Sequence, residues 1–448
     1  MMAGKLFQDI SGRSCFYVTA SNEIVIPDQR WLDSWPAAER ETAVLREAGG
    51  EDIPGPPFRW PMSREEYHAY LTAKIPRLTL EVTRRCTLRC DYCIYSGNYR
   101  YVRTHEALDM PLETAQQSIR VYASRSTGSA SRLIRFYGGE TFMNFPMIRD
   151  SVAYANRLCA DKPLHYSIST NGTTLTDKVI EWLAQNRNVT VSITLNGPEH
   201  DQYRRFPSGE GSLTTIMNTI KHLWSRHPEV WEKQIHFIAN ITSDEVLPEL
   251  RSFYLDKVGK MPSVITRIFP YGGNEIIQNM IDRRNVHKPS ALAYSQTGDA
   301  FLAARYRYGI EQIALRPIIK EGSFNIPVGC CMPFQGGIFV AANGTFGMCE
   351  RTSPAVPFGD LDHGFCEDVL DAFLVDAISL FDQKCRFCWG RRLCDLCFSS
   401  FMDDRGLPDK IPEEVCLNKL EQICQDLGSY SSIASNNRYL LHKLKHHC

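Results

Sequence analysis

The sequence of 448 residues contains no long apolar segment. No run approaches the roughly 18 apolar residues of a membrane-spanning helix, and the amino-terminal MMAGKLFQDI lacks the apolar core of a secretory signal. Basic residues are not in excess either, because the formal net charge is −1. Nothing in this charge attracts the chain to nucleic acid or to anionic lipid. We therefore expect a cytoplasmic globular protein with neither a membrane nor a nucleic acid as its partner.

Cysteine, by contrast, is abundant, with 16 residues. In a reducing compartment disulfides seldom persist, so clustered thiols indicate metal binding or redox catalysis. Three cysteines fall within residues 86–93, and nine fall between Cys330 and Cys416. Isolated cysteines such as Cys159 and Cys424 suit small buried hydrophobic side chains, but the two clusters do not.

The pattern of apolar residues divides the chain into four parts. Residues 1–75 predict a small α+β unit, with two short strands within 14–28, a helix over 37–50 and a proline-rich connector over 51–61. Residues 296–425 form a cysteine-rich and loop-rich region that we expect to be separate, organised by ligands more than by a large core. Residues 426–448 predict a terminal helix and tail.

The second part, residues 76–295, alternates strand and helix patterns and so predicts a parallel sheet covered by helices. Six such units fall short of the eight of a complete barrel, so the fold class is α/β with a partial (β/α)6 barrel. The expected helices include 112–124, 145–158 and 212–224. The expected strands are 78–82, 133–137, 165–169, 189–195, 235–241 and 264–269.

The first thiol cluster follows the first strand of the predicted barrel. Cys86, Cys90 and Cys93 are spaced Cys-x3-Cys-x2-Cys and lie where the active sites of barrels are built. Three thiolates on one loop can hold three irons of a 4Fe–4S cluster and leave the fourth iron open. The alternative is a structural zinc site whose fourth ligand comes from a distant part of the chain.

This spacing resembles the radical S-adenosylmethionine (SAM) superfamily, and three later strand ends match it too. These are YGGE at 137–140, STNGT at 169–173 and ITLNGPEHDQYRR at 193–205. The resemblance implies a radical SAM partial barrel whose second loop holds the SAM amino group and whose Arg204 pairs with the SAM carboxylate. The family often has an aspartate in an S-x-D-G-P segment, where this chain has Thr194 and Asn196. Alone, GGE would be a simple turn and Arg204 a solvated surface residue. By resemblance the cofactor-binding residues are Tyr92, Gly138, Gly139, Glu140, Asn171, Thr194 and Arg204.

The second thiol cluster resembles the SPASM domain, an addition to radical SAM enzymes that holds two auxiliary 4Fe–4S clusters. The resemblance assigns the outer cluster to Cys385, Cys388, Cys394 and Cys416. It assigns the inner cluster to Cys349, Cys397 and one of Cys330 or Cys331. The family commonly has three residues between the last cysteine pair, and this chain has two. The alternative is a zinc-ribbon-like pair of knuckles formed by Cys385, Cys388, Cys394 and Cys397.

The inner ligand set bears on function. In sulfatase-maturing relatives a further cysteine completes this set, but MPFQGG at 332–337 contains none. Either Cys330 and Cys331 both reach the cluster or one iron is open, and we favour an open iron that binds a substrate thiolate. By the same resemblance Tyr95 and Glu350 line the substrate pocket as catalytic residues, with Glu350 as the base; a plain surface carboxylate is the alternative.

Together these resemblances imply a radical SAM oxidoreductase that uses three 4Fe–4S clusters and SAM to modify a ribosomally made precursor peptide. The segment at 90–110 resembles maturases that form cysteine thioethers. The amino-terminal unit resembles winged-helix modules that bind a precursor leader as an added strand, although it could simply pack on the barrel. A flavodoxin or ferredoxin would supply electrons. The alternatives are an anaerobic sulfatase-maturing enzyme, a maturase that forms carbon–carbon or carbon–oxygen crosslinks, and a non-catalytic zinc-binding interaction protein.

Overall fold

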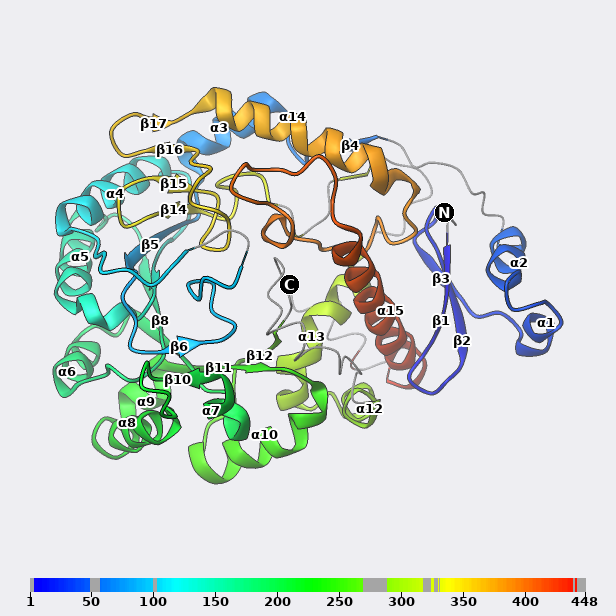
Figure 1. Ribbon diagram of the computed structural model, residues 1–448, viewed down its shortest axis with the longest axis horizontal. Coiled ribbons are helices and arrows are strands. Elements are labelled where there is room, and N and C mark those ends of the chain that lie inside the picture. Colours follow the sequence, from blue (N-terminus) through cyan, green and yellow to red (C-terminus); the bar gives the residue numbers. More distant parts are fainter. Residues whose placement is uncertain are drawn as a thin grey trace.

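The computed structural model describes residues 4–48, 57–99, 103–268, 288–316, 324–325, 329, 331–437 and 440. Its centre is a sheet of eight strands in the order β12-β11-β9-β8-β7-β5-β14-β15 (Figure 1). The strands are β5 (Arg77–Thr83), β7 (Arg132–Gly138), β8 (Leu164–Thr170), β9 (Val189–Thr194), β11 (Ile235–Ile241), β12 (Val264–Arg267), β14 (Ile338–Val340) and β15 (Phe346–Gly347).

The six predicted barrel strands are confirmed, and each pairs in parallel with its neighbour from β5 to β12. Their ends agree with the predicted ones to within two residues, and residue 269 lies outside the described part of the chain. Helices follow the strands and cover one face of the sheet (Figure 1). They are α4 (Leu112–Arg125), α5 (Phe145–Leu158), α6 (Asp177–Gln185), α8 (Leu213–Arg226), α9 (Pro228–Gln234) and α10 (Leu247–Phe253).

Alternation along the strands separates the two faces of the sheet. Ile168, Val191 and Phe237 are fully buried and belong to the main core. Tyr166 lies on the same face, because its hydroxyl donates to Asn156 of α5 at 2.8 Å. Their neighbours along the strands, Ser167, Ser192 and His236, are polar and partly exposed. These neighbours point to the opposite face, which therefore lines an open interior.

The carboxyl-terminal region is continuous with the barrel, which differs from the separate region that we expected. β14 pairs in parallel with β5, and β15 returns antiparallel to β14, so this region extends the sheet at its β5 edge. The apolar side chains of Ile338, Phe339 and Val340 are buried there, which favours strand addition over a free-standing loop. The region also contains α14 (Glu367–Lys384) and α15 (Glu413–Asn436), and α12 (Lys288–Thr297) and α13 (Ala300–Ala314) lead into it.

The amino-terminal unit is a three-stranded antiparallel sheet followed by short helices. β1 (Gly4–Gln8), which was not predicted, pairs with β2 (Ser14–Val18), and β2 pairs with β3 (Glu23–Val25). The predicted helix is shorter, as α2 (Arg40–Glu47), and α1 (Gln29–Asp33) precedes it. The sheet lies beside α15 (Figure 1), where the Ile10 amide donates to Ser432 Oγ at 3.1 Å. Farther on, β4 (Phe58–Arg59) pairs with β13 (Phe324–Asn325), and α3 (Arg64–Ala73) packs on α4.

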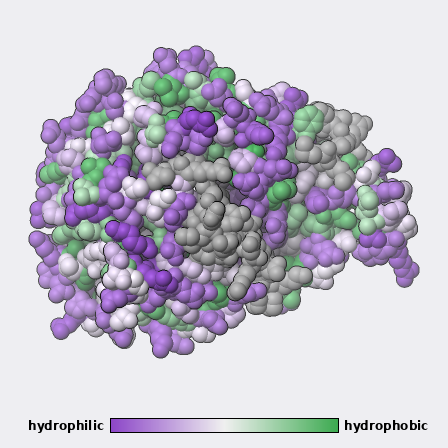
Figure 2. All heavy atoms as spheres, in the orientation of Figure 1, coloured by the Kyte–Doolittle hydropathy of each residue, from purple (hydrophilic) through white to green (hydrophobic). Residues whose placement is uncertain are grey.

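The surface is largely hydrophilic on the face shown in Figure 2, with hydrophobic residues scattered over it. Among the helices of the described residues, none combines the length and apolar character needed to span a bilayer.

Candidate active site

The loop after β5 carries the three barrel thiols and pairs with the loop after β9, the fourth strand of the barrel. Cys90 lies in β6 (Arg89–Cys90), which pairs antiparallel with β10 (Arg204–Arg205), so that Arg204 stands opposite Cys90. The Asp91 amide donates to the Tyr203 carbonyl at 3.1 Å and extends this pairing. The bridge brings Arg204 beside the thiols, although more than a hundred residues separate them in the sequence.

The three thiols lie close enough to influence one another's ionisation. Burial raises the pKa of Cys86 to about 11 and that of Cys93 to about 12, while Arg204 opposes both shifts. The free thiols therefore hold their protons at neutral pH, and iron that binds them as thiolates would displace those protons. The amides of Leu88 and Tyr95 each lie 3.4 Å from a thiol sulfur, as donors do around cluster thiolates.

The three barrel thiols are the candidate ligands for the iron–sulfur cluster that the resemblance implies. Within the described residues, no three His, Cys, Asp or Glu side chains converge tightly enough to hold one metal ion. A zinc site with Zn–S bonds of about 2.3 Å needs its thiolates much closer together than a cube of four irons does. The residues that would hold a 4Fe–4S cluster here are Cys86, Cys90 and Cys93.

The GGE loop packs directly on the start of the thiol loop. The Gly139 amide donates to Thr83 O at 2.8 Å, and the Glu140 amide donates to Arg85 O at 2.8 Å. A Cβ atom on Gly139 would lie 2.2 Å from Arg85 O, and one on Gly138, where φ is +148°, would lie 2.3 Å from Thr83 O. Both glycines are therefore needed for this close approach of two backbones.

Glu140 organises the loop after β8. It is fully buried, and its carboxylate accepts from the Asn171 amide at 2.8 Å and from the hydroxyls of Thr170 and Thr174 at 2.7 Å. Burial raises the pKa of Glu140, and these hydrogen bonds oppose that shift. The carboxylate thus supports Asn171, and its predicted contact with the SAM amino group stays a prediction.

Tyr92 joins the strand-four loop to Arg204. Its hydroxyl accepts from Asn196 Nδ2 at 2.8 Å and from Arg204 Nη1 at 3.0 Å. Asn196, which stands where the family often has aspartate, also accepts the Asn240 amide at 3.0 Å. Arg204 is 5% exposed, and its Nε has no hydrogen-bond partner within the described residues. A buried guanidinium with an unused donor fits a carboxylate ligand, which is the role predicted for it. Thr194 is half-buried at the end of β9.

The carboxyl-terminal thiols fall into two electrostatic neighbourhoods. Burial raises the pKa of Cys385, and its thiol neighbours Cys394, Cys388 and Cys416 raise it further. Burial likewise raises the pKa of Cys349 and of Cys331, and Cys397 adds to both shifts. This division is the same as that of the predicted outer and inner sets, and the clusters themselves stay a prediction. Cys330 lies outside the described residues.

Glu350 and Tyr95 occupy different surroundings. Glu350 is 9% exposed, and its Oε1 lies 3.2 Å from Nη1 of Arg135 on the interior face of β7. Tyr95 is 1% exposed and donates its hydroxyl to Glu81 at 2.8 Å. Tyr95 therefore belongs to the wall of the site in this structure, and a direct contact with substrate stays a prediction.

The interior face of the sheet between these loops is polar and partly open. Strand register places Arg135, Ser167 and Thr190 in one row across β7, β8 and β9. It places Ser169, Ser192 and His236 in another row across β8, β9 and β11. All six are partly exposed, so this face offers hydroxyl and cationic groups to a polar ligand such as a peptide backbone.

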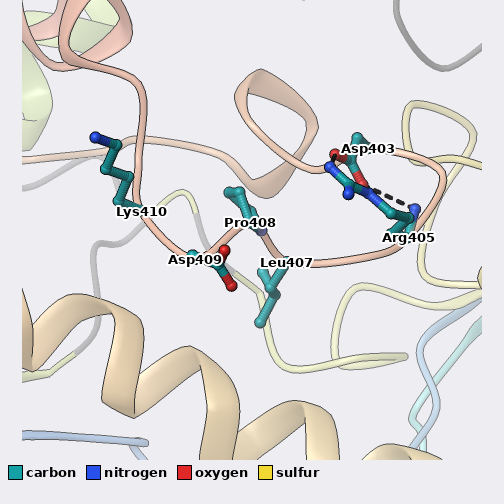
Figure 3. Close-up of a pocket in the computed structure, with 6 residues that line it drawn as sticks. All are labelled: Asp403, Arg405, Leu407, Pro408, Asp409 and Lys410. Atoms are coloured by element: carbon teal, nitrogen blue, oxygen red, sulfur yellow. Dashed lines mark hydrogen bonds and ion pairs between the residues drawn. The ribbon is translucent and has the colours of Figure 1, made fainter.

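A separate hollow lies in the segment between Cys397 and Cys416. Figure 3 shows Asp403 paired with Arg405, with a separation of 3.3 Å, beside Leu407, Pro408, Asp409 and Lys410. No predicted site residue lines it. The segment that lines the hollow contacts the segment after Glu350 at Ser353, whose hydroxyl donates to Asp404 at 2.5 Å. We therefore do not include this hollow in the candidate site.

Several residues that surround the site escaped the sequence analysis. Asn240 lies one residue before the end of β11, and its position between the buried Ala239 and Ile241 was a usable signal for an interior position. Glu81 is a lone carboxylate within the apolar strand LTLEV, which signals a buried polar network. Arg103 and Arg135 carried no such signal, because their partners lie far away in the chain.

Comparison with known proteins agrees with this geometry. Residues 80–231 match the family model of the Radical SAM superfamily. The chain is 28% identical over 149 residues to the serine-type anaerobic sulfatase-maturating enzyme of Bacteroides thetaiotaomicron, covering 33% of this chain and 35% of that protein. It is 30% identical over 177 residues to the radical SAM cyclopropyl synthase TigE of Paramaledivibacter caminithermalis, covering 37% and 34%. The matched stretch thus spans about a third of each of these curated relatives.

The solved structure of native anSMEcpe with bound AdoMet superposes with a TM-score of 0.58 at 14% identity, covering 83% of this chain and 100% of that one. The same protein with AdoMet and the Cp18Cys peptide gives a TM-score of 0.56 at 14% identity, covering 83% and 99%. At this identity the likeness concerns the fold.

Proposed function

This chain carries a radical SAM domain, and we propose that it is a maturase that joins a cysteine sulfur of a ribosomally made peptide to another residue as a thioether. The inner thiol set carries this proposal. Cys331, Cys349 and Cys397 share one neighbourhood, and residues 332–337 contain no further cysteine. A 4Fe–4S cluster held by three thiolates keeps one iron free for a soft ligand such as a substrate thiolate.

The side chains of the site divide the work of this reaction. When bound, the clusters and SAM supply two things: a 5′-deoxyadenosyl radical, which removes a hydrogen atom from the substrate, and an acceptor for one electron. Arg204, whose Nε has no partner among the described residues, would hold the SAM carboxylate, and Tyr92 holds Arg204 in place. The polar interior rows receive the peptide. Thioether formation also releases a proton, which Glu350 accepts while Arg135 orients its carboxylate.

A second function, oxidation of a cysteine or serine side chain to formylglycine, has its own support. A curated relative is an anaerobic sulfatase-maturating enzyme, and the fold matches anSMEcpe, which has been solved with the Cp18Cys peptide. The partial inner thiol set and the amino-terminal sheet favour the thioether reaction instead.

Mass spectrometry separates the two functions. The anaerobically reconstituted chain is incubated with SAM, a reductant and either the Cp18Cys peptide or cysteine-bearing peptides encoded beside its gene. A loss of two hydrogens together with loss of the alkylatable thiol supports the thioether. An aldehyde that reacts with a hydrazide supports formylglycine formation. Neither product from any peptide, despite SAM cleavage, would refute both functions.

Variants of the thiols provide matched controls. Cys86→Ala, Cys90→Ala or Cys93→Ala abolishes SAM cleavage but leaves the barrel folded, whereas Cys388→Ala destabilises the carboxyl-terminal region, since ligand binding there contributes to folding. Normal deoxyadenosine production by any of the first three contradicts the assignment. Zinc without iron in the air-free protein would favour the non-catalytic alternative.

The proposal extends to two partners. The leader of the precursor adds as a strand at β3, which pairs only with β2 among the described strands. A flavodoxin or ferredoxin supplies the electrons. The first partner is tested by comparing the binding of a labelled leader peptide to the wild-type chain with its binding to the Ile24→Pro variant.

A further inference from the structure

We propose that Glu81 and Arg103 form a positioning pair, which holds the loop of the barrel thiols and the loop of the inner thiols at a fixed separation. This inference rests on the proposed function, because it concerns the space in which the substrate lies between the two thiol sets. The pair touches neither set directly and acts through the segments that it joins.

Glu81 is a carboxylate with no exposed surface, placed near the end of β5. Its Oε1 accepts the Tyr95 hydroxyl at 2.8 Å, and Tyr95 lies two residues after Cys93. Its Oε2 accepts the Ala342 amide at 3.0 Å, in the turn between β14 and β15 that leads to Cys349. One side chain therefore links both thiol-bearing segments.

Arg103 makes the second link. It is 3% exposed, and its Nη1 lies 3.5 Å from Glu81 Oε1. Its Nη2 donates to the Thr352 carbonyl at 3.3 Å, two residues beyond Glu350. Its guanidinium also lies over the Phe339 ring of β14, 4.5 Å from the ring centre. Arg103 thus extends the connection from Glu81 to the segment that carries the predicted base.

The energetics make this connection stiff. A buried carboxylate that loses a partner is left uncompensated, so the segments donating to Glu81 stay in place. The charges also balance locally, because Arg84 lies 3.3 Å from Glu81 and 3.1 Å from the half-exposed Glu106. Two carboxylates therefore face two guanidiniums, Arg84 and Arg103. Fixed separation matters for a radical reaction, because a displacement of about 1 Å can cost about a hundredfold in rate.

The Glu81→Gln variant tests the proposal, because glutamine keeps the shape but removes the charge. We expect iron content and SAM cleavage to stay within about twofold, while product formed per deoxyadenosine falls at least about fivefold. A merely structural role would lower both rates and the iron content together and leave that ratio unchanged. Glu106→Gln is the matched control, since it removes the half-exposed carboxylate that pairs with Arg84, the arginine that also pairs with Glu81. Its product formed per deoxyadenosine should equal that of the wild type.

Hydrogen exchange tests the same pair without any peptide. In Glu81→Gln the amide of Ala342 should exchange at least about tenfold faster than in the wild type, while amides of β9 keep their protection. Arg103→Met, which keeps Glu81 and removes the second link, covers the case in which Glu81→Gln does not fold. Arg103→Lys should restore part of the product ratio that Arg103→Met loses.

Two results would overturn the proposal: an unchanged product ratio in Glu81→Gln, or unchanged exchange at Ala342. The two proposals fail separately. If exchange responds as expected but no peptide is ever modified, the proposed function fails and the positioning pair remains.

Discussion

Asn171 lies against Cys86, with its side-chain amide nitrogen 3.7 Å from the thiol sulfur. The same amide donates to Thr87 Oγ1 at 3.0 Å, and its carbonyl accepts from the Thr173 amide at 2.9 Å, which fixes its orientation. Donors near a cluster thiolate raise the reduction potential, because they stabilise the added electron. Asn171→Asp replaces the donor with a negative charge and should lower SAM cleavage about 10- to 100-fold with iron content retained.

Deoxyadenosine assays and a potentiometric titration monitored by electron paramagnetic resonance provide the measurement. Asn98→Asp is the control, because it places the same charge on an exposed position shortly after the barrel thiols. If Asn171→Asp shows the wild-type potential and rate, its contact with Cys86 has no part in the chemistry.

The close approach of two loops predicts a strong effect of Gly139→Ala. The added methyl would lie 2.2 Å from Arg85 O, so either the GGE loop or the thiol loop must move. We expect a loss of about 1–3 kcal/mol in the free energy of unfolding and poor incorporation of iron at the barrel site. Thermal unfolding and iron analysis check both effects. Gly336→Ala is the control, since its methyl would meet nothing nearer than an Arg77 side-chain atom at 3.8 Å; equal behaviour of the two variants would refute the explanation.

The barrel could be predicted from the sequence because its signals are local. Each of the six barrel strands is a short apolar run, so β5, β7, β8, β9, β11 and β12 were predicted to within two residues. The strand ends of a parallel sheet share one edge, and in this structure Asn171 lies against Cys86 while the GGE loop packs on Thr83 and Arg85.

The features that escaped prediction depend on distant partners. β6 and β10 are two residues long, and neither has a strand pattern of its own. The pairing of β14 with β5 joins residues about 260 positions apart, which no periodicity reveals. For the same reason LTLEV shows that Glu81 needs partners and does not identify Arg103 or Ala342.

Asp426 predicts a pH-dependent term in stability. Burial against α13 raises its pKa from 3.8 to about 6, although Arg305, Lys419 and a hydrogen bond from Gln422 at 3.1 Å oppose the shift. Between these two values the folded chain keeps the proton that the unfolded chain releases. The contribution of the protonated Asp426 to the free energy of unfolding is therefore fully present below pH 3.8. It is lost as pH rises through about 6, and the loss is roughly 3 kcal/mol.

Asp426→Asn removes this titration. The difference in thermal midpoint between variant and wild type should favour the variant increasingly from pH 4 to pH 7 and then level off. The wild-type curve alone is not informative, since other carboxylates titrate over the same range. A difference that does not vary with pH would mean that Asp426 ionises as freely in the folded chain as in the unfolded one.

Thr19 connects the amino-terminal sheet to the outer thiol set. It has no exposed surface, and its hydroxyl donates at 2.7 Å to the carbonyl of Trp389, the residue after Cys388. The Tyr17 ring packs edge-on against the Trp389 ring at 6.3 Å. Thr19→Val keeps the shape but leaves that carbonyl without its donor, which should cost about 1–3 kcal/mol. Faster amide exchange in β2 and β3 and lower iron occupancy of the outer set should appear together.

The contact also predicts coupling in the opposite direction, because a free energy shared by two sites acts equally on both. Cys388→Ala, which removes a predicted ligand from the outer set, should loosen β2 and β3 even though it lies in another part of the chain. In a double-mutant cycle Thr19→Val should then add little to Cys388→Ala. Thr219→Val, which removes an exposed hydroxyl within α8, serves as the control and should leave both regions unchanged. Fully additive effects of Thr19→Val and Cys388→Ala would show that the amino-terminal sheet and the outer thiol loop share no coupling free energy. Leader binding at the sheet could then not depend on the state of that loop.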